Sequence, residues 1–241
     1  ARLGGMNVAM ELRTPPGATA PARFSSNAHI PAELRGQPMD GWWLKISRPG
    51  TSDWMLSRDE IAFREAREAF KGTGIDVIET RSTRLPDGTR AVFQRRAPGK
   101  NVTEVVQDLF GDAMGSEPTR EASESLIQHL LEPQYAPCFS GKGTDYLCGE
   151  LLDHGIDLGK AGAKLQDPSV RSLLGRLRTL RNVNETSPAL AGTRQAMDGR
   201  LVGNKLFWME GRGLVTGLDL SVDNFTVEMV GGEARIHIFD L

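Results

Sequence analysis

Short apolar runs between turn residues occur at both ends of the chain, and this pattern predicts β-strands. The run 41–46 is rich in aromatic and branched residues. A hairpin is expected around Pro86-Asp87-Gly88, and a second one around Gly231-Gly232-Glu233 near the C-terminus. The pattern therefore predicts strands at 7–12, 41–46, 76–85, 89–95, 225–230 and 234–239.

Helical spacing dominates the middle of the chain. Behind the cap candidate Asn101, apolar residues from Val102 to Phe110 recur at i, i+3, i+4, i+7 and i+8. One earlier helix is expected from Ser57 to about Gly72, because Ser57 and Glu60 have the spacing of a capping box. Further helices are predicted near 119–131, 144–153, 168–182 and 187–198.

The order of these elements predicts an α+β fold. Strands with one helix come first, then a run of helices, and finally a hairpin. The character of the sequence changes at Pro98-Gly99. We therefore expect two lobes, a strand-rich lobe at 1–97 and a mostly helical lobe at 98–241.

Charge and hydropathy exclude several classes of partner. Lys and Arg total 29 against 31 Asp and Glu, so the chain has no bulk positive field to drive binding to nucleic acid. Its apolar runs are far shorter than the roughly 20 residues that span a bilayer, and no secretory signal follows the N-terminus. The sequence predicts a soluble protein without a membrane span.

The chain has two cysteines, Cys138 and Cys148, too few for a framework of disulfides. His129 and His154 are near them in sequence, but the spacing matches no zinc pattern. We therefore favour free structural thiols and a reducing compartment.

Candidate chemistry lies close to the C-terminus. Asp219-Leu220 is followed by Asn224 five positions after the aspartate, then by the predicted hairpin, and then by Asp240. This order resembles the catalytic core of protein kinases and their small-molecule kinase relatives, with its Asp-Leu-x-x-x-Asn loop, hairpin and metal-binding Asp. The resemblance implies that Asp219 is the catalytic base and that Asn224 and Asp240 bind Mg²⁺ against the phosphates of ATP. Without the resemblance, these residues are ordinary loop residues.

The N-terminal half is similar to a kinase N-lobe in the order of its parts. Lys45, in the predicted strand 41–46, matches the lysine that neutralises nucleotide phosphates. Glu65 matches its ion-pair partner on the following helix, with Glu60 and Glu68 as competing choices. Taken singly, Lys45 is equally consistent with a solvated edge-strand lysine, and Glu65 with an exposed helix charge.

The segment 94–101 resembles the hinge that opens the C-lobe in bacterial kinase-like proteins. This resemblance places the adenine pocket near Phe93, Arg95 and Ala97. Arg95-Arg96 is also consistent with a solvated strand end.

Two departures from the kinase pattern change the expectation. No Gly-x-Gly-x-x-Gly loop precedes Lys45, which leaves 25–27 or 15–18 to hold phosphate. Gly217-Leu218 replaces the usual His-Arg before the catalytic Asp, so control by activation-loop phosphorylation is not expected. These features resemble atypical or minimal bacterial kinases, some of which are secreted effectors. For an effector, the resemblance implies export by a non-Sec route into a host cell.

Three functions remain open on the sequence. The first is an ATP- and Mg²⁺-dependent phosphotransferase acting on a hydroxyl, with protein Ser/Thr favoured over a small molecule such as an aminoglycoside or sugar. The second is a pseudokinase or interaction module that keeps the bilobal fold without turnover. The third is an unrelated α+β interaction protein whose kinase-like spacings are coincidental.

Overall fold

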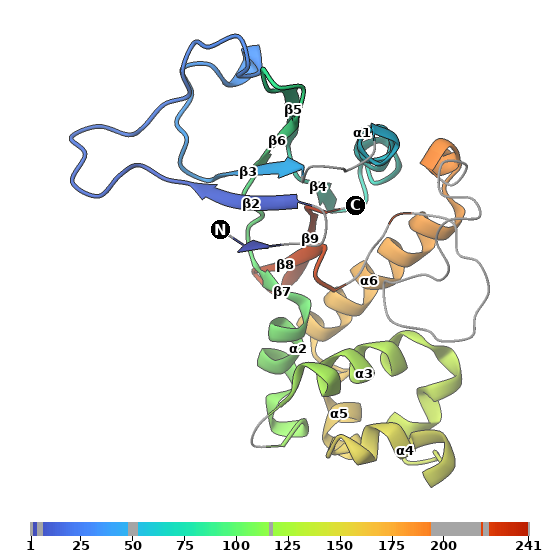
Figure 1. Cartoon of the computed structure of the whole chain (residues 1–241). Coiled ribbons are helices and arrows are strands. Elements are labelled where there is room, and N and C mark those ends of the chain that lie inside the picture. The colour runs from blue at the N-terminus through green and yellow to red at the C-terminus, as the bar shows by residue number, and fades with distance from the viewer. Residues whose placement is uncertain are drawn as a thin grey trace. The chain divides into compact units, whose positions relative to one another are not determined.

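A computed structural model describes residues 2–3, 7–47, 53–115, 118–193, 218 and 222–240, without the side chains of 2–3, 7 and 53–60. The predicted α+β class is confirmed, because this part of the chain contains two β-sheets together with helices (Figure 1). No helix among the described residues has the length and apolar character needed to cross a membrane.

The chain forms two compact units. Unit 1 comprises residues 1–63 and 78–97, and unit 2 comprises 64–77 and 98–241. Segment 64–77 thus groups with the C-terminal residues, although the sequence assigned it to the first lobe. The division into lobes at 97/98 stays a prediction.

Unit 1 contains an antiparallel sheet in the order β1-β2-β3-β6-β5. The bounds of its strands are Arg2–Leu3 (β1), Asn7–Leu12 (β2), Trp42–Ser47 (β3), Thr80–Arg84 (β5) and Arg90–Arg95 (β6). Alternate residues of β3 pack inward, so Trp42 and Leu44 join a core with Phe24 and Phe93. The rings of Trp42 and Phe93 both meet the ring of Phe24 edge to face.

Two predicted boundaries in the N-terminal half are wrong. Helix α1 spans Asp53–Ala69, so Ser57 lies inside it rather than at its start. The strand expected at 76–85 is two strands in different sheets, β4 (Ile75–Val77) and β5. β4 leaves the hairpin because it pairs in parallel with a C-terminal strand, where Ile75 is buried.

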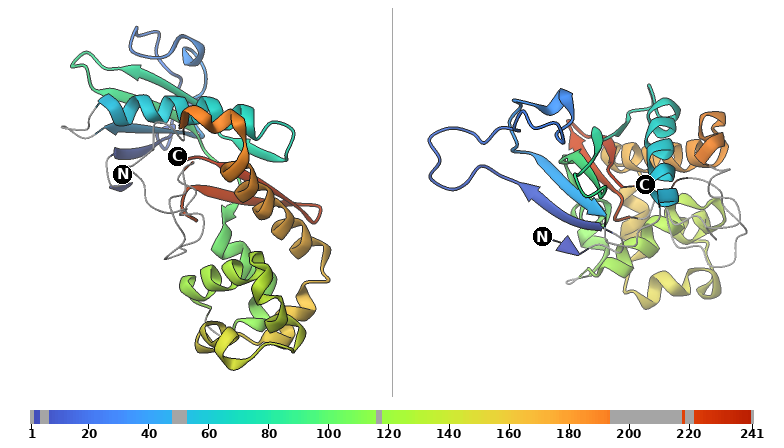
Figure 2. Two further views of the ribbon diagram at one scale, coloured as in Figure 1. Left: turned by 90° about the vertical axis from the view of Figure 1, so that its right-hand side faces the viewer. Right: turned by 45° about the horizontal axis from the view of Figure 1, so that its top comes forward.

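The mixed sheet of unit 2 has the order β4-β9-β8-β7. β7 spans Lys100–Asn101, β8 spans Phe225–Val230 and β9 spans Glu233–Ile238, so the predicted C-terminal hairpin is confirmed to within a residue. β9 packs against helix α6, and both views in Figure 2 show these two elements side by side. The alternate β9 residues Ala234, Ile236 and Ile238 are fully buried.

The helices of unit 2 follow the sequence pattern with one addition. α2 (Val102–Phe110), α3 (Arg120–Leu131), α4 (Asp145–Asp153) and α6 (Pro168–Thr186) match predicted helices, although α6 continues four residues further. α5 (Leu158–Lys164) was not predicted, because two glycines in seven residues lower its helix propensity. Gly162 is required by packing, since a Cβ there would lie 2.1 Å from the Phe139 carbonyl oxygen.

Short 3₁₀ segments complete the helical connections. They are η1 (Ala32–Leu34), η2 (Gly111–Ala113), η3 (Pro133–Ser140) and η4 (Pro188–Leu190). Of the helix predicted at 187–198, residues 188–193 are helical, Ser187 is the N-cap before them, and 194–198 lie outside the described residues.

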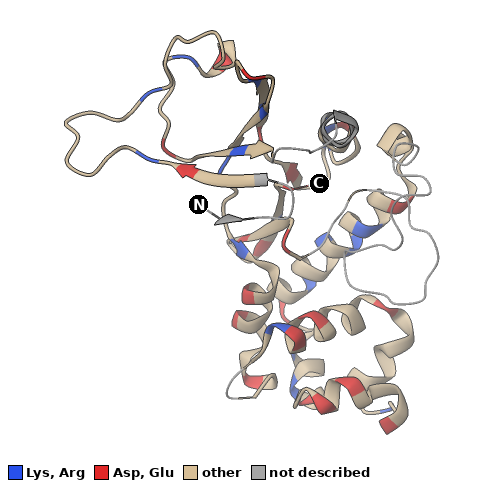
Figure 3. Cartoon of the chain, viewed as in Figure 1, with Lys and Arg blue, Asp and Glu red and all other residues tan. Residues whose placement is uncertain are grey.

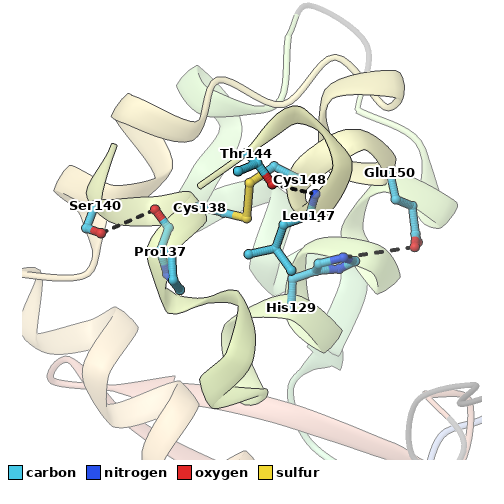
Figure 4. The surroundings of a disulfide bond; sticks show 8 residues. All are labelled: His129, Pro137, Cys138, Ser140, Thr144, Leu147, Cys148 and Glu150. Atoms are coloured by element: carbon cyan, nitrogen blue, oxygen red, sulfur yellow. Dashed lines mark hydrogen bonds and ion pairs between the residues drawn. A yellow bond between two sulfur atoms is a disulfide. The ribbon is translucent and has the colours of Figure 1, made fainter. Parts of the chain in front are cut away.

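Cys138 of η3 and Cys148 of α4 form a disulfide, so the prediction of free thiols is wrong (Figure 4). Spacing alone did not show that η3 turns back and brings the two sulfurs together. The connection is tight at Gly143, where a Cβ would lie 2.3 Å from the Cys148 sulfur. The bond counts against the reducing compartment that the low cysteine count favoured.

Removal of this disulfide should lower thermal stability. The cysteines are 10 positions apart, and closing a loop of that size stabilises a fold by about 2–3 kcal/mol in the chain-entropy model. We expect the double variant Cys138→Ser/Cys148→Ser to unfold about 5–10 °C below the wild type in a thermal melt. Reduction of the wild type should give the same shift and leave the double variant unchanged. Two titratable thiols in the unreduced, denatured wild type would contradict the bond.

Candidate functional site

The two predicted metal ligands lie together at the open end of the β8–β9 hairpin. Asn224 immediately precedes β8, and Asp240 follows β9 by two residues. The Asn224 carbonyl oxygen accepts hydrogen bonds from the backbone N–H groups of Phe239, at 2.9 Å, and Asp240, at 3.2 Å. The hairpin therefore brings together two residues that are 16 positions apart in sequence.

This arrangement suits a hard cation held jointly with a ligand. In the hairpin register Asn224 faces Phe239, the residue before Asp240, and the two backbone hydrogen bonds keep Asn224 and Asp240 adjacent, which makes an amide oxygen and a carboxylate the candidate ligands of one ion. Mg²⁺ takes oxygen ligands and usually binds through one or two protein groups plus waters and substrate phosphates. Within the described ranges, no group of three or more His, Cys, Asp or Glu side chains could hold a metal alone. Asn224 and Asp240 thus fit a metal that arrives with a nucleotide.

The loop that leads into this hairpin is fixed at Leu218 by one buried side chain. Asn184, on α6, is 0% exposed. Its Oδ1 accepts a hydrogen bond from the Leu218 backbone N–H at 2.8 Å, and its Nδ2 donates to the Leu218 carbonyl oxygen at 3.3 Å. One amide side chain therefore pairs with both polar groups of a backbone unit, as a neighbouring strand would.

Two further side chains hold the loop just before Asn224. Asn101 caps α2 by accepting from the Thr103 N–H, and its Nδ2 donates to the Val222 carbonyl oxygen at 3.0 Å. Arg120, the first residue of α3, donates to the Asp223 carboxylate at 2.7 Å. The N-terminal ends of α2 and α3 therefore both contact residues 222–223.

Arg120 keeps its positive charge in this ion pair, but the pair contributes little to the free energy of folding. The hydrogen bond to Asp223, followed by the one to Glu124, raises the pKa of Arg120 above its ordinary value. Arg120 therefore stays protonated at every accessible pH. Both Arg120 and Asp223 are half-exposed, so solvent screens the pair and it adds little stability.

Asp219, the predicted catalytic base, lies outside the described residues, as do Leu220 and Ser221. Its neighbours Leu218 and Val222 are described, and both are bound through their backbones to buried or capping amides. Asp219 is thus the next residue in sequence after Leu218, whose backbone Asn184 holds. Its predicted role stays a prediction.

Lys45 and Glu65, the predicted ion pair, lie in different units. Lys45 is in the middle of β3, opposite Ala9 of β2 and Val92 of β6. It occupies the sheet face opposite to the core, because side chains alternate along a strand and Trp42 and Leu44 face the core. The ion pair itself stays a prediction.

Glu65 has partners in its own unit. Its Oε2 accepts from the Thr193 backbone N–H at 2.7 Å and from the Thr193 hydroxyl at 2.9 Å. Of the competing glutamates, Glu68 is exposed, and the side chain of Glu60 lies outside the described part. The Glu65 carboxylate therefore binds Thr193, which lies in the helical segment 191–193.

The residues predicted around adenine have different surroundings. The Phe93 side chain is 4% exposed and packs in the core of unit 1. The Arg95 guanidinium lies 4.8 Å from the centre of the Trp42 ring and 3.9 Å from the Glu79 carboxylate. Ala97 is half-buried. Nucleotide contacts at these residues stay a prediction.

Both candidate phosphate loops lie in the long connection between β2 and β3. Residues 15–18 form a turn closed by a hydrogen bond from the Ala18 N–H to the Pro15 carbonyl oxygen. Residues 25–27 lead into a second turn, where the Asn27 side chain accepts from the His29 N–H at 2.8 Å.

Sequence reasoning missed Asn184, although a signal was present. Asn184 continues the apolar stripe of α6, seven residues after Leu177 and four after Leu180, and those leucines are fully buried. An amide on a buried stripe must find hydrogen-bond partners inside the protein. Its partner is 34 residues away in sequence, so the stripe indicated a buried amide without indicating its contact.

In comparisons of the chain with protein-family models, with curated proteins and with solved structures, nothing matches.

Proposed function

We propose that the chain is an ATP- and Mg²⁺-dependent phosphotransferase with a bilobal, protein-kinase-like fold. The observation that carries the proposal is the juxtaposition of Asn224 and Asp240, whose backbones are hydrogen-bonded at the open end of the hairpin. The fixed loop residues 218 and 222–223 add support, because Asp219 lies between them in sequence. Two sequence positions of the kinase resemblance, Asn224 and Asp240, thus lie next to each other, and the third, Asp219, is between described residues in sequence.

The proposed roles follow from the chemistry of each side chain. Bound Mg²⁺ would neutralise phosphate charge that develops during transfer. Asn224 and Asp240 would hold that ion, and Asp219 would accept the proton of the attacking hydroxyl. Lys45, oriented by Glu65, would neutralise the phosphates, and the chain around Phe93, Arg95 and Ala97 would receive adenine.

A protein Ser/Thr hydroxyl is the proposed acceptor, as in bacterial effector kinases. Purified protein should therefore transfer label from γ-³²P-ATP to itself or to a broad mixture of proteins when Mg²⁺ is present. Label in an aminoglycoside or a sugar would instead assign a small-molecule acceptor. Normal ATP binding without transfer to any acceptor would assign a pseudokinase, and the absence of ATP binding would contradict the proposal.

Lys45→Met should abolish most transfer without unfolding the protein. The substitution removes a positive charge from the sheet face opposite to the core, so the packing of Trp42 and Leu44 is preserved. We expect transfer to fall about 100-fold or more, with a melting temperature close to that of the wild type. Lys71→Met is the matched control, because Lys71 is an exposed lysine outside the proposed site. Full transfer by Lys45→Met would show that Lys45 does not act on phosphate.

A further inference from the structure

Helix α6 connects the two parts of the candidate site. Near its start, the Ser172 hydroxyl accepts from the Ala234 N–H at 2.9 Å, and Arg176 donates to the Ala234 carbonyl oxygen at 3.1 Å. Near its end, Asn184 binds Leu218. Ser172 and Asn184 are twelve residues apart, which is roughly 18 Å along a helix axis. One rigid element therefore holds both the hairpin and the residue that precedes Asp219.

We propose that Asn184 is a positioning residue for the phosphotransferase site. It fixes Leu218, the residue that precedes Asp219 in sequence, relative to the hairpin that carries Asn224 and Asp240. This inference rests on the proposed function, and it adds a residue to which the kinase resemblance gave no role.

Because the contact between Asn184 and Leu218 is buried, loss of its hydrogen bonds would be costly in free energy. Asn184 is 0% exposed and Leu218 is 4% exposed, so water does not compete for these hydrogen bonds. If the amide is removed, the Leu218 N–H and carbonyl groups are left buried and must move to find partners. Because Leu218 is bonded to Asp219 along the chain, movement of Leu218 would shift the backbone to which the proposed base is attached.

In Figure 3 several positions along the α6 ribbon are blue, which marks Lys and Arg residues. Arg176 donates to backbone carbonyl oxygens of Thr73 and Ala234, and Arg178 donates to that of Leu130. Arg181 pairs with Glu132 and Glu185. Since these arginines bind other segments, the contact to Leu218 can be changed at Asn184 without altering how α6 is held elsewhere.

The variant Asn184→Asp separates positioning from folding. It preserves the volume of the side chain and the oxygen that accepts from the Leu218 N–H. When ionised, it loses the donor and places a carboxylate oxygen against the Leu218 carbonyl. When protonated, its hydroxyl can donate to that carbonyl and restore both bonds. The effect of the variant should therefore disappear as the pH falls.

Two readouts test this expectation between pH 8 and pH 5.5. Hydrogen exchange at the Leu218 amide, corrected for its intrinsic pH dependence, should be about 10- to 100-fold faster at pH 8 than in the wild type and should recover at low pH. The ratio of variant to wild-type kcat for γ-³²P transfer should fall about tenfold or more at pH 8 and recover in parallel, with the KM for ATP within about twofold. Asn182→Asp, on the exposed face of α6, should change neither quantity.

The readouts distinguish the inference from the function on which it rests. Unchanged exchange at Leu218 both in Asn184→Asp and in Asn184→Leu, whose side chain has neither donor nor acceptor at any pH, would overturn the contact. Faster exchange with an unchanged kcat ratio would overturn the positioning role. A wild type without transfer would overturn the proposed function, and the catalytic part of the inference with it, while the exchange measurement would still decide whether Asn184 fixes Leu218. If the variant melts more than about 10 °C below the wild type, the recovery at low pH decides the question, because a general packing defect would not recover.

Discussion

Asp219→Asn should lower kcat for phosphoryl transfer about 100- to 10,000-fold and leave ATP affinity within about twofold of the wild type. The asparagine has nearly the same size but cannot accept the proton of the attacking hydroxyl. In the proposed site this carboxylate acts on the acceptor, and the nucleotide is held by other groups. The measurement is single-turnover transfer from γ-³²P-ATP beside a calorimetric titration of ATP with Mg²⁺.

Asp153→Asn is the matched control for this prediction. Asp153 is the exposed last residue of α4, so the same loss of charge there should leave both quantities unchanged. A kcat for Asp219→Asn within about twofold of the wild type would remove Asp219 from the catalytic machinery. An equal loss of ATP affinity and kcat would instead assign Asp219 to the metal or the nucleotide.

Asp240→Ala should weaken nucleotide binding and transfer together. A carboxylate that holds Mg²⁺ against the phosphates contributes in the ground state and more strongly in the transition state, where charge develops. We expect transfer to fall about 100- to 1,000-fold, with at least a tenfold loss of Mg-ATP affinity. Asn224→Ala should show the same direction with a smaller loss, because its amide oxygen is a neutral ligand. Transfer and affinity are measured as for Asp219→Asn.

The hairpin itself should survive these substitutions. The hydrogen bonds that join Asn224 to Phe239 and Asp240 are made by backbone atoms, which the substitutions retain. Thermal melts of Asp240→Ala and Asn224→Ala should therefore stay close to the wild type. Unchanged Mg-ATP affinity in a folded Asp240→Ala protein would contradict metal binding by Asp240.

Local signals explain which parts of the fold were predictable. α2 begins with a capping box at Asn101, and the β8–β9 hairpin has two glycines at its turn, so both could be located from a few neighbouring residues. The predicted start of α1 at Ser57 was wrong, and so was the prediction of one continuous strand over 76–85. β4 pairs with β9, so that Ile75 lies opposite Ile236, and no local sequence pattern predicts a pairing between residues so far apart in sequence.

In the candidate site, too, residues joined by local structure could be predicted, and contacts between distant segments could not. Asn224 and Asp240 were singled out by their order in the kinase resemblance, and the hairpin between them explains why their backbones are in contact. The contact between Asn184 and Leu218 depends on how α6 packs, and the Cys138–Cys148 bond depends on the turn of η3. Both are tertiary contacts that residue spacing does not encode.

In the proposed site, Asn224 and Asp240 hold a metal ion whose coordination is completed by a nucleotide. Calorimetric titration of ATP into the wild-type protein, once with Mg²⁺ and once with EDTA, tests it most directly. Because Mg²⁺ seldom binds without substrate phosphates to complete its octahedron, the account predicts tight ATP binding with Mg²⁺, weak binding in EDTA, and little binding of Mg²⁺ alone. Equal ATP affinity with and without Mg²⁺, or no ATP binding at all, would contradict it.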